Sequence, residues 1–350
     1  MHSDVFHNAI AEQRRTEQRR FSIIAILLFV LFFSFILDIA TGPALLNVQS
    51  VLDALLHLAG VPIEVDPTTQ VIVQKLRLPI AIMAVLVGGV LGVGGAEMQT
   101  LLNNPMASPY TLGLAAAAGF GAAAALFFDT FGFSPSIVVP ISAFLFCMLA
   151  ALFLFSLAMM RRINSGQLVL AGIALLFLFQ SLLSLVQFVS SPELSQQILF
   201  WLFGSLSKSN WNSVALVCLV TAICLFFLMR DAWKLTALRL GEARAKSLGV
   251  DVARLRLKTL FLVAVMTATV TSFVGIIGFV GIVAPNMARM IVGEDQRYFL
   301  PLSFILGAFL LSSASVLSKV IVPGALFPIG IVTAIIGVPF FFWLIISKRK

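Results

Sequence analysis

The sequence offers few side chains whose type and spacing could support catalysis or metal binding. The three histidines are scattered outside the apolar runs, and the three cysteines fall inside them. Cysteines in such runs behave as small hydrophobic side chains, and no zinc or disulfide spacing occurs. We therefore expect no catalytic residue, no metal site and no cofactor. The residues concerned are His2, His7, His57, Cys147, Cys218 and Cys224.

Motifs that handle nucleotides or attack carbonyl groups are missing as well. The sequence has no G-x-x-x-x-G-K-[ST] phosphate loop, so the chain cannot hydrolyse a nucleotide by that route. It has no H-E-x-x-H or G-x-S-x-G, which argues against an intramembrane protease or esterase. Glu97 is the acidic residue placed well inside an apolar run; it is either functional or a carboxyl that snorkels or pairs near the interface. Energy for uphill transport must come from elsewhere.

The elements that position these residues are membrane helices. The chain of 350 residues is 60% hydrophobic and 11% charged, with a mean hydropathy of +1.06, which is too little polar surface for a soluble globule. Uncharged runs of about 20 residues recur, the length of a membrane-spanning helix, whereas a barrel shows alternating segments of about ten. The sequence predicts an all-α polytopic membrane protein. The basic N-terminus before the first run reads as a signal anchor that is retained.

Six spans are predicted before residue 230, and three apolar candidates follow residue 256. The run from Thr259 to Ala288 is too long for one span, because 30 residues of helix measure about 45 Å. The first six predicted spans are 21–40, 78–101, 110–128, 137–159, 168–189 and 211–229.

The distribution of basic residues shows how the long run is divided. If the chain breaks at Gly275 to Gly281 and returns, all but four of the 23 basic residues share one face. Cytoplasmic loops collect Lys and Arg, so this arrangement is favoured. It gives ten spans with both termini cytoplasmic, in the inner membrane of a bacterium, and no nucleic-acid partner. The four exceptions are Lys75, Arg77, Lys208 and Lys319.

The break itself carries the strongest signal for a transport path. Its glycines permit a tight turn and close backbone approach, and a proline disrupts the half-length helix that follows. Non-helical backbone at membrane depth persists only inside protein or beside a water-filled cavity. A glycine-lined helix contact without a cavity is the alternative. The path residues expected here are Gly275, Gly278, Gly281, Pro285 and Asn286.

Two further stretches have local explanations. Ala84, Gly88, Gly92 and Ala96 recur every four residues, which predicts a seam for close helix packing. Residues 235–258 form the largest cytoplasmic connection, with a short amphipathic helix that stops at Gly249, followed by a second helix capped at its start. This loop either lies on anionic lipid headgroups or fits a groove of another protein.

Four motifs follow one another along the chain: "RLPIAIMAVLVGGVLGVGGAEMQTLLNNPMASPYTLG", "LRLGEARAKSLGV", "GFVGIVAPNMAR" and "FPIGIVTAIIGVPFFFWLI". Together they resemble the FecCD-type permease subunits of ABC importers for ferric siderophores, heme and cobalamin, from about residue 21 to the end. The resemblance implies the type II importer fold, with residues 1–20 as a cytoplasmic N-terminal segment and 21–350 as one transmembrane permease domain. It also implies a dimer of ATPase subunits, a second permease subunit, identical or paralogous, and an extracytoplasmic substrate-binding protein.

The resemblance implies roles for particular residues. Asn164 and Ser165 correspond to the cytoplasmic gate, and Arg77 and Lys319 to positions that dock the binding protein. The family's second arginine is Ile80 here, which weakens the docking inference. The contact with the ATPase would lie in the coupling loop 235–258, at Leu240, Gly241, Glu242, Ala245, Leu248 and Gly249.

Among cargoes, a ferric siderophore is the first expectation, because "NNPMASPYTLG" looks most like the siderophore branch, and heme and cobalamin remain open. The family's histidine after the proline is Asn286 here, and its acidic residue in the ninth span is replaced around Ser315. Rival functions are a secondary transporter or channel that works without an ATPase, and a membrane scaffold or intramembrane enzyme.

Overall fold

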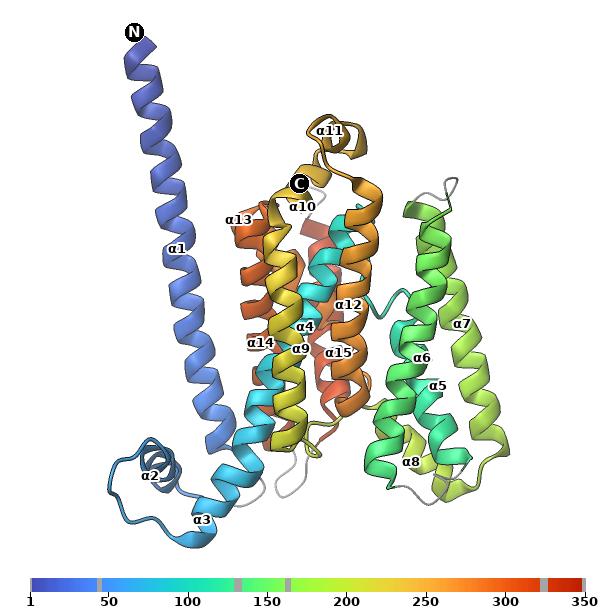
Figure 1. The fold of residues 1–350 in the computed structure, drawn as a ribbon. Coiled ribbons are helices and arrows are strands. Elements are labelled where there is room, and N and C mark those ends of the chain that lie inside the picture. The colour runs from blue at the N-terminus through green and yellow to red at the C-terminus, as the bar shows by residue number, and fades with distance from the viewer. Residues whose placement is uncertain (1, 43–45, 129–133, 161–164, 322–326, 348–350) are drawn as a thin grey trace.

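The computed structural model describes residues 2–42, 46–128, 134–160, 165–321 and 327–347. The regular elements found in these ranges are helices, long ones separated by short ones (Figure 1). In chain order they are α1 (His2–Ala40), α2 (Val48–Leu58), α3 (Pro67–Val71), the π-helical η1 (Ile72–Arg77), α4 (Leu78–Leu101), α5 (Leu114–Phe127), α6 (Pro135–Ala158), α7 (Ser165–Val189), α8 (Pro192–Leu202), α9 (Trp211–Arg230), α10 (Ala232–Arg239), α11 (Glu242–Ser247), α12 (Val252–Val274), α13 (Val280–Val292), α14 (Gln296–Val320) and α15 (Ile329–Ser347).

Seven of the described helices are long and apolar enough to cross a membrane: α1, α4 with the residues before it, α6, α7, α9, α12 and α14. The shorter apolar helices α5, α13 and α15 occupy the three remaining predicted spans. The all-α polytopic fold is therefore confirmed, with the difference that α5 and α13, of 14 and 13 residues, are shorter than a full crossing. In α5 the shortening is local, because residues 108–113 form turns that end at Gly113, whose φ is +79°.

α4 and α14 form the most extensive helix pair in the molecule. A Cβ atom added at Gly88 would lie 2.3 Å from the carbonyl oxygen of Gly307, and one added at Gly92 would lie 2.2 Å from that of Ser303. The predicted small-residue seam is thus confirmed as a packing surface, and its partner is α14. Backbones approach this closely only where side chains are small.

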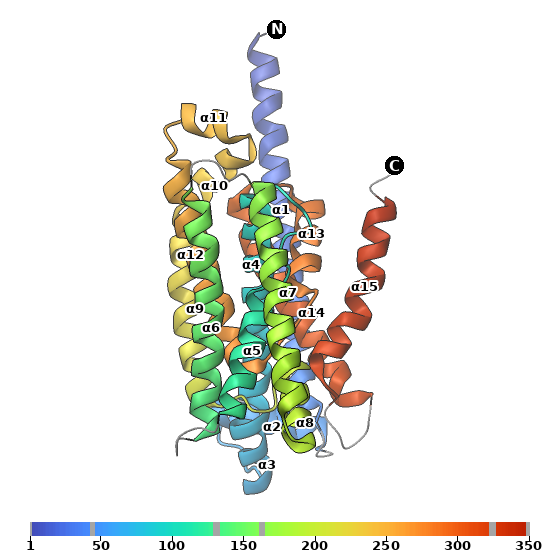
Figure 2. The ribbon, with the colours of Figure 1, turned by 90° about the vertical axis from the view of Figure 1, so that its right-hand side faces the viewer.

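The remaining helices surround this pair. α13 packs against α4 and α14, and α1 lies along α14. α5 contacts α6, α7 and α8, and α12 joins this second group to α4 and α9. α15 leans away from the body in Figure 2; its buried side chains, among those described, are Ile329, Val332 and Thr333, close to its start.

The long run after residue 256 is divided as predicted. α12 ends at Val274, residues 275–279 are not helical, and α13 begins at Val280. The chain then returns, because the turn after α13 contacts α10: Arg239 forms an ion pair with Glu294. α11, the start of α1 and the end of α13 lie at one end of the molecule, and α2, α3 and α8 at the other (Figure 1).

Candidate transport path and coupling surface

The turn between α12 and α13 is a junction of three chain segments. Gly275 has φ +76°, and a Cβ atom added there would lie 2.2 Å from the carbonyl oxygen of Trp201 at the end of α8. The amide of Ser205 donates to the carbonyl of Val274 at 2.8 Å, and that of Gly330 donates to Phe203 at 3.0 Å. The break therefore holds the ends of α8 and α15 together through backbone contacts.

The junction also contains a strained residue. Phe279 has φ +65°, a conformation that is unusual for an aromatic side chain. A Cβ atom added at Gly337 of α15 would lie only 2.4 Å from the Cβ atom of Phe279. Gly278 is different from its neighbours, because nothing lies within 4 Å of an added Cβ and its φ is not positive. Of the predicted path glycines, Gly275 has a clear conformational reason and Gly278 has none.

Pro285 explains why α13 approaches α4 so closely. It has no N–H to donate to the carbonyl of Gly281 four residues earlier. That carbonyl faces Gly95 of α4, where an added Cβ would lie 1.7 Å away. Asn286, which is 2% exposed, donates from Nδ2 to the carbonyls of Ile282 and Pro105 at 2.8 and 3.1 Å. Gly281, Pro285 and Asn286 thus lie in a tight interface between α13, α4 and the loop after α4.

The predicted coupling loop forms an exposed cap on one end of the molecule. α11 is flanked by Gly241 and Gly249, with φ of +104° and +81°, and nothing lies within 4 Å of a Cβ added at either. Leu240 and Leu248 expose 55% and 50% of their surface, whereas Ala245 is fully buried. The predicted helix stop at Gly249 is confirmed, and so is the cap of the next helix, where Asp251 accepts from the amide of Arg254 at 3.1 Å.

Ion pairs attach this loop to the membrane helices. Glu242 of α11 pairs with Arg256 in the first turns of α12. At the end of α9, Asp231 pairs with Lys258 and, at 2.8 Å, with Lys234. Burial raises the pKa of Asp231, but the hydrogen bonds and charges of the two lysines outweigh it and hold the pKa below its usual value. The loop is therefore fixed to α9 and α12, so a force applied to α11 reaches both helices.

The two residues predicted to dock the binding protein are buried. The guanidinium of Arg77 donates to the carbonyls of Ile39 and Ala40 at 2.9 and 2.8 Å, at the end of α1. Lys319 pairs with Asp38 at 2.7 Å, and the exposed fractions of these two side chains are 4% and 0%. Their docking role stays a prediction, and in this conformation each side chain would have to leave its partners. The described basic residues that are exposed at this end are Lys75 and Lys208.

The predicted gate is only partly described. Asn164 lies outside the described residues, and Ser165 is the first residue of α7. No ion pair across this position is recorded for the part of the chain that is described, so the gate stays a prediction.

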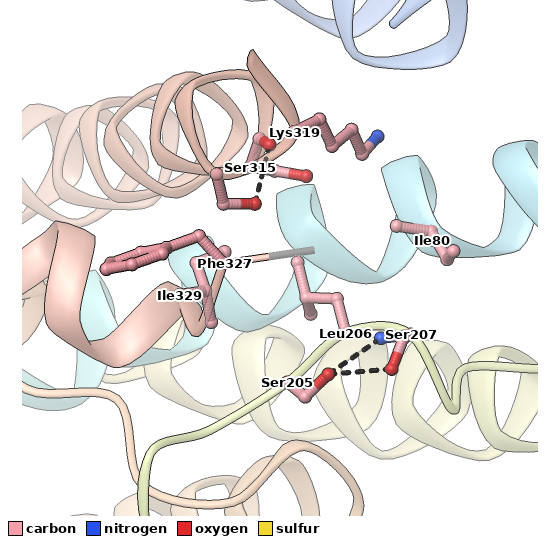
Figure 3. A pocket seen from close by; sticks show the side chains of 9 residues that line it. Ile80, Ser205, Leu206, Ser207, Ser315, Lys319, Phe327 and Ile329 are labelled. Atoms are coloured by element: carbon pink, nitrogen blue, oxygen red, sulfur yellow. Dashed lines mark hydrogen bonds between the residues drawn. The ribbon is translucent and has the colours of Figure 1, made fainter. Parts of the chain in front are cut away.

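Figure 3 shows a pocket between the start of α4, the loop before α9, the end of α14 and the start of α15. Hydroxyl groups of Ser205, Ser207, Ser315 and Ser318 line it, while the Lys319 ammonium points to Asp38. Its volume of about 20 Å³ accommodates a single water molecule. A ligand larger than a few atoms does not fit this pocket.

Glu97 is fully buried, and neither carboxyl oxygen has a hydrogen-bond partner in the described part of the chain. Glu97 therefore neither snorkels to the interface nor pairs with a described residue in this conformation. Among the described residues, no three His, Cys, Asp or Glu side chains gather as metal ligands would.

Comparisons with known proteins agree with this architecture. The family model described as "FecCD transport family" matches residues 28–347. The Fe(3+)-citrate import system permease of Bacillus subtilis is 33% identical over 95% of this chain and 96% of its own length. The molybdate import system permease of Haemophilus influenzae is 33% identical over 82% of this chain and 85% of its own.

A solved structure described as an inward-facing, metal-chelate type ABC transporter superimposes with a TM-score of 0.81 at 30% identity. It covers 93% of this chain, and the match covers 99% of the solved chain. The match to the family model spans almost all of the described helices, and the fold agrees along the same length. The chain therefore belongs to the FecCD transport family, as a multi-pass membrane permease subunit of an ABC importer.

Proposed function

We propose that the chain is the permease of an ATP-driven importer that takes up an iron complex, with a ferric siderophore as first candidate. The observation that carries this proposal is the exposed α11 cap, which has apolar residues on its surface and is fixed by ion pairs to α9 and α12. A lipid-bound loop would not need two glycines with positive φ to present a six-residue helix. Such a cap fits a groove in an ATPase subunit.

In this mechanism the ATPase dimer closes beneath the permease and displaces α11. The displacement rocks the membrane helices between inward-open and outward-open states. The path would run between this chain and a second permease subunit, a copy or a paralogue. The coupling end, with both termini, would face the cytoplasm, and a binding protein would deliver cargo at the end that carries α2, α3 and α8.

The decisive experiment reconstitutes the permease in liposomes with its cognate ATPase and binding protein. We expect uptake to require ATP and to stop when ATP is removed while an ion gradient is kept. Uptake that persists on the gradient alone would favour the secondary transporter.

Two substitutions test the coupling surface in that system. Gly249→Val places a β-branched side chain at φ +81°, and Glu242→Arg sets a second cation against Arg256. We expect both to lose co-purification with the ATPase while the permease still inserts. The matched control is Gly60→Val, which introduces the same strain at φ +92° in the loop after α2 at the far end. Unchanged ATPase binding in both coupling variants would contradict the proposal.

The cargo is decided separately. Relatives at equal identity carry Fe(3+)-citrate and molybdate in their names, and heme and cobalamin are the other family cargoes left open by the sequence. Titrating the cognate binding protein with ferric siderophores, heme, cobalamin and molybdate would identify it, and tight binding of anything but a ferric chelate would overturn the siderophore assignment.

A further inference from the structure

A connected set of charged and amide side chains leads from the coupling loop into the interface between α13 and α4. Arg239, the last residue of α10, donates from Nε to Glu294 Oε2 at 3.0 Å and from a terminal nitrogen to Oε1. Glu294 lies in the turn between α13 and α14, and its Oε1 is also 3.2 Å from Nε of Arg289. One carboxylate therefore bridges two guanidinium groups. We call Arg239, Glu294 and Arg289 the Glu294 bridge.

The bridge continues into the buried part of the molecule. Arg289 donates to Gln99 of α4 at 2.9 Å and to Oδ1 of Asn286 at 3.2 Å. Asn286 in turn donates to the carbonyl of Pro105 in the loop after α4. The set thus reaches from the base of α11 to the α13 residues that the sequence places on the path.

The exposure of the bridge distinguishes it from an ordinary surface pair. The Arg239 and Arg289 side chains are 15% and 17% exposed, and Glu294 is 41% exposed. Exposed ion pairs contribute little, whereas removal of one partner from a shielded pair leaves a charge without compensation. Here the loss of one carboxylate would leave two shielded cations side by side.

α13 is consequently held at both ends by elements that begin at the coupling loop. Its N-terminal end follows α12 through the turn at 275–279, and its C-terminal end is tied to α10 by the bridge. α13 also packs against α4 and α14, and the bridge adds a direct link between its C-terminal end and α10. A second attachment at the opposite end makes it follow the displacement as a unit.

We propose that Glu294 is a positioning residue that transmits displacement of the coupling loop to α13, so that ATP hydrolysis is converted into movement of the path. This inference rests on the proposed function, because it takes α10 and α11 as the elements on which an ATPase acts.

The test measures substrate imported per ATP hydrolysed in liposomes that contain the permease, its cognate ATPase and its binding protein. Glu294→Gln removes the shared charge with little change of shape. We expect the ratio to fall about tenfold, within the ~5–150-fold range typical of coupling between sites, while ATPase co-purification stays at the wild-type level. Arg239→Gln should lower this ratio by a similar factor. The double variant Glu294→Gln/Arg239→Gln should have a ratio no lower than either single variant, because both substitutions disrupt the same contact.

The matched control is Asp295→Asn. Asp295 lies next to Glu294 and pairs with Arg297 at 2.8 Å, but this pair stays within the start of α14. Asparagine caps a helix as well as aspartate does, so the control should behave like the wild type. If Glu294→Gln does not insert, Arg239→Lys keeps the charge but loses the two-nitrogen contact, and it should lower the ratio by a smaller factor.

The outcomes separate the two proposals. A wild-type complex that imports nothing with ATP would contradict the proposed function. A wild-type complex that imports normally, with Glu294→Gln at the same ratio or Asp295→Asn lowered as much, would overturn the role of Glu294 alone.

Discussion

Burial gives Lys319 and Arg77 a structural role that their charge alone does not indicate. Both lie at the end of the molecule opposite α11, and both bind the last residues of α1, one through Asp38 and one through backbone carbonyls. The carbonyls at a helix C-terminus lack intrahelical partners and favour nearby cations. These two side chains therefore fasten α1 to α14 and to η1, which continues directly into α4.

This fastening predicts a pattern of stability. Asp38→Leu or Lys319→Met alone should destabilise the permease by about 3 to 5 kcal/mol, because each leaves a buried charge unpaired. The double variant should regain most of that loss, as judged by thermal unfolding in detergent.

The double variant also isolates the docking role. With stability restored and Lys319 absent, unchanged affinity for the binding protein at low salt would exclude Lys319 from docking. A loss of stability in the double variant as large as in the single ones would contradict the paired arrangement instead.

The sequence could predict that Glu294 and Arg239 are polar loop residues, but not that they meet. They are 55 positions apart, and their contact depends on the return of the chain after α12. The same holds for Asp38 and Lys319, 281 positions apart, since charge patterns show the side of the membrane and not the partner. The end of α11 and the start of α12 were easier to predict, because a glycine with positive φ and a cap at Asp251 leave local signals.

At the scale of elements, the boundaries that hydrophobicity determines were predicted well. α4 has the predicted ends, Leu78 and Leu101, and the break was predicted at 275–281 and observed at 275–279. The elements missed were α2, α3, η1, α8 and α10, which are short and lie between spans. α2 is amphipathic, and Asn47, Asp66 and Ser191 cap the starts of α2, α3 and α8, so local signals for these three helices are present in the sequence.

The contact between α13 and α4 yields a prediction for two glycines that look alike in sequence. Gly95→Ala sets a methyl group against the Gly281 carbonyl, so we expect a large loss of folded protein. Gly278→Ala meets nothing within 4 Å and should be tolerated. Fluorescence size-exclusion profiles of the two variants compare them directly. Equal profiles would show that α4 and α13 are not in backbone contact in the membrane.

For the whole molecule, the return of the chain after α12 decides which ends share a compartment. Met290 on α13 is 58% exposed. In a background without native cysteines, Arg244→Cys on α11 and Met290→Cys should react with the same impermeant reagent from the same side. Lys208→Cys should react only from the opposite side. Labelling of positions 244 and 290 from different sides would contradict the arrangement of ten helices.

The glycine contacts of α4 have a mechanical consequence. Where Gly88 meets Gly307 and Gly95 meets Gly281, the helix backbones are in direct contact. No side chain lies between them that could change rotamer to absorb a movement. We expect α4, α13 and α14 to move as one rigid unit, with the same relative arrangement in every state of the transport cycle. Opening and closing must then be a sliding of this unit along the interfaces that side chains fill, chiefly those toward α1, α9 and α12.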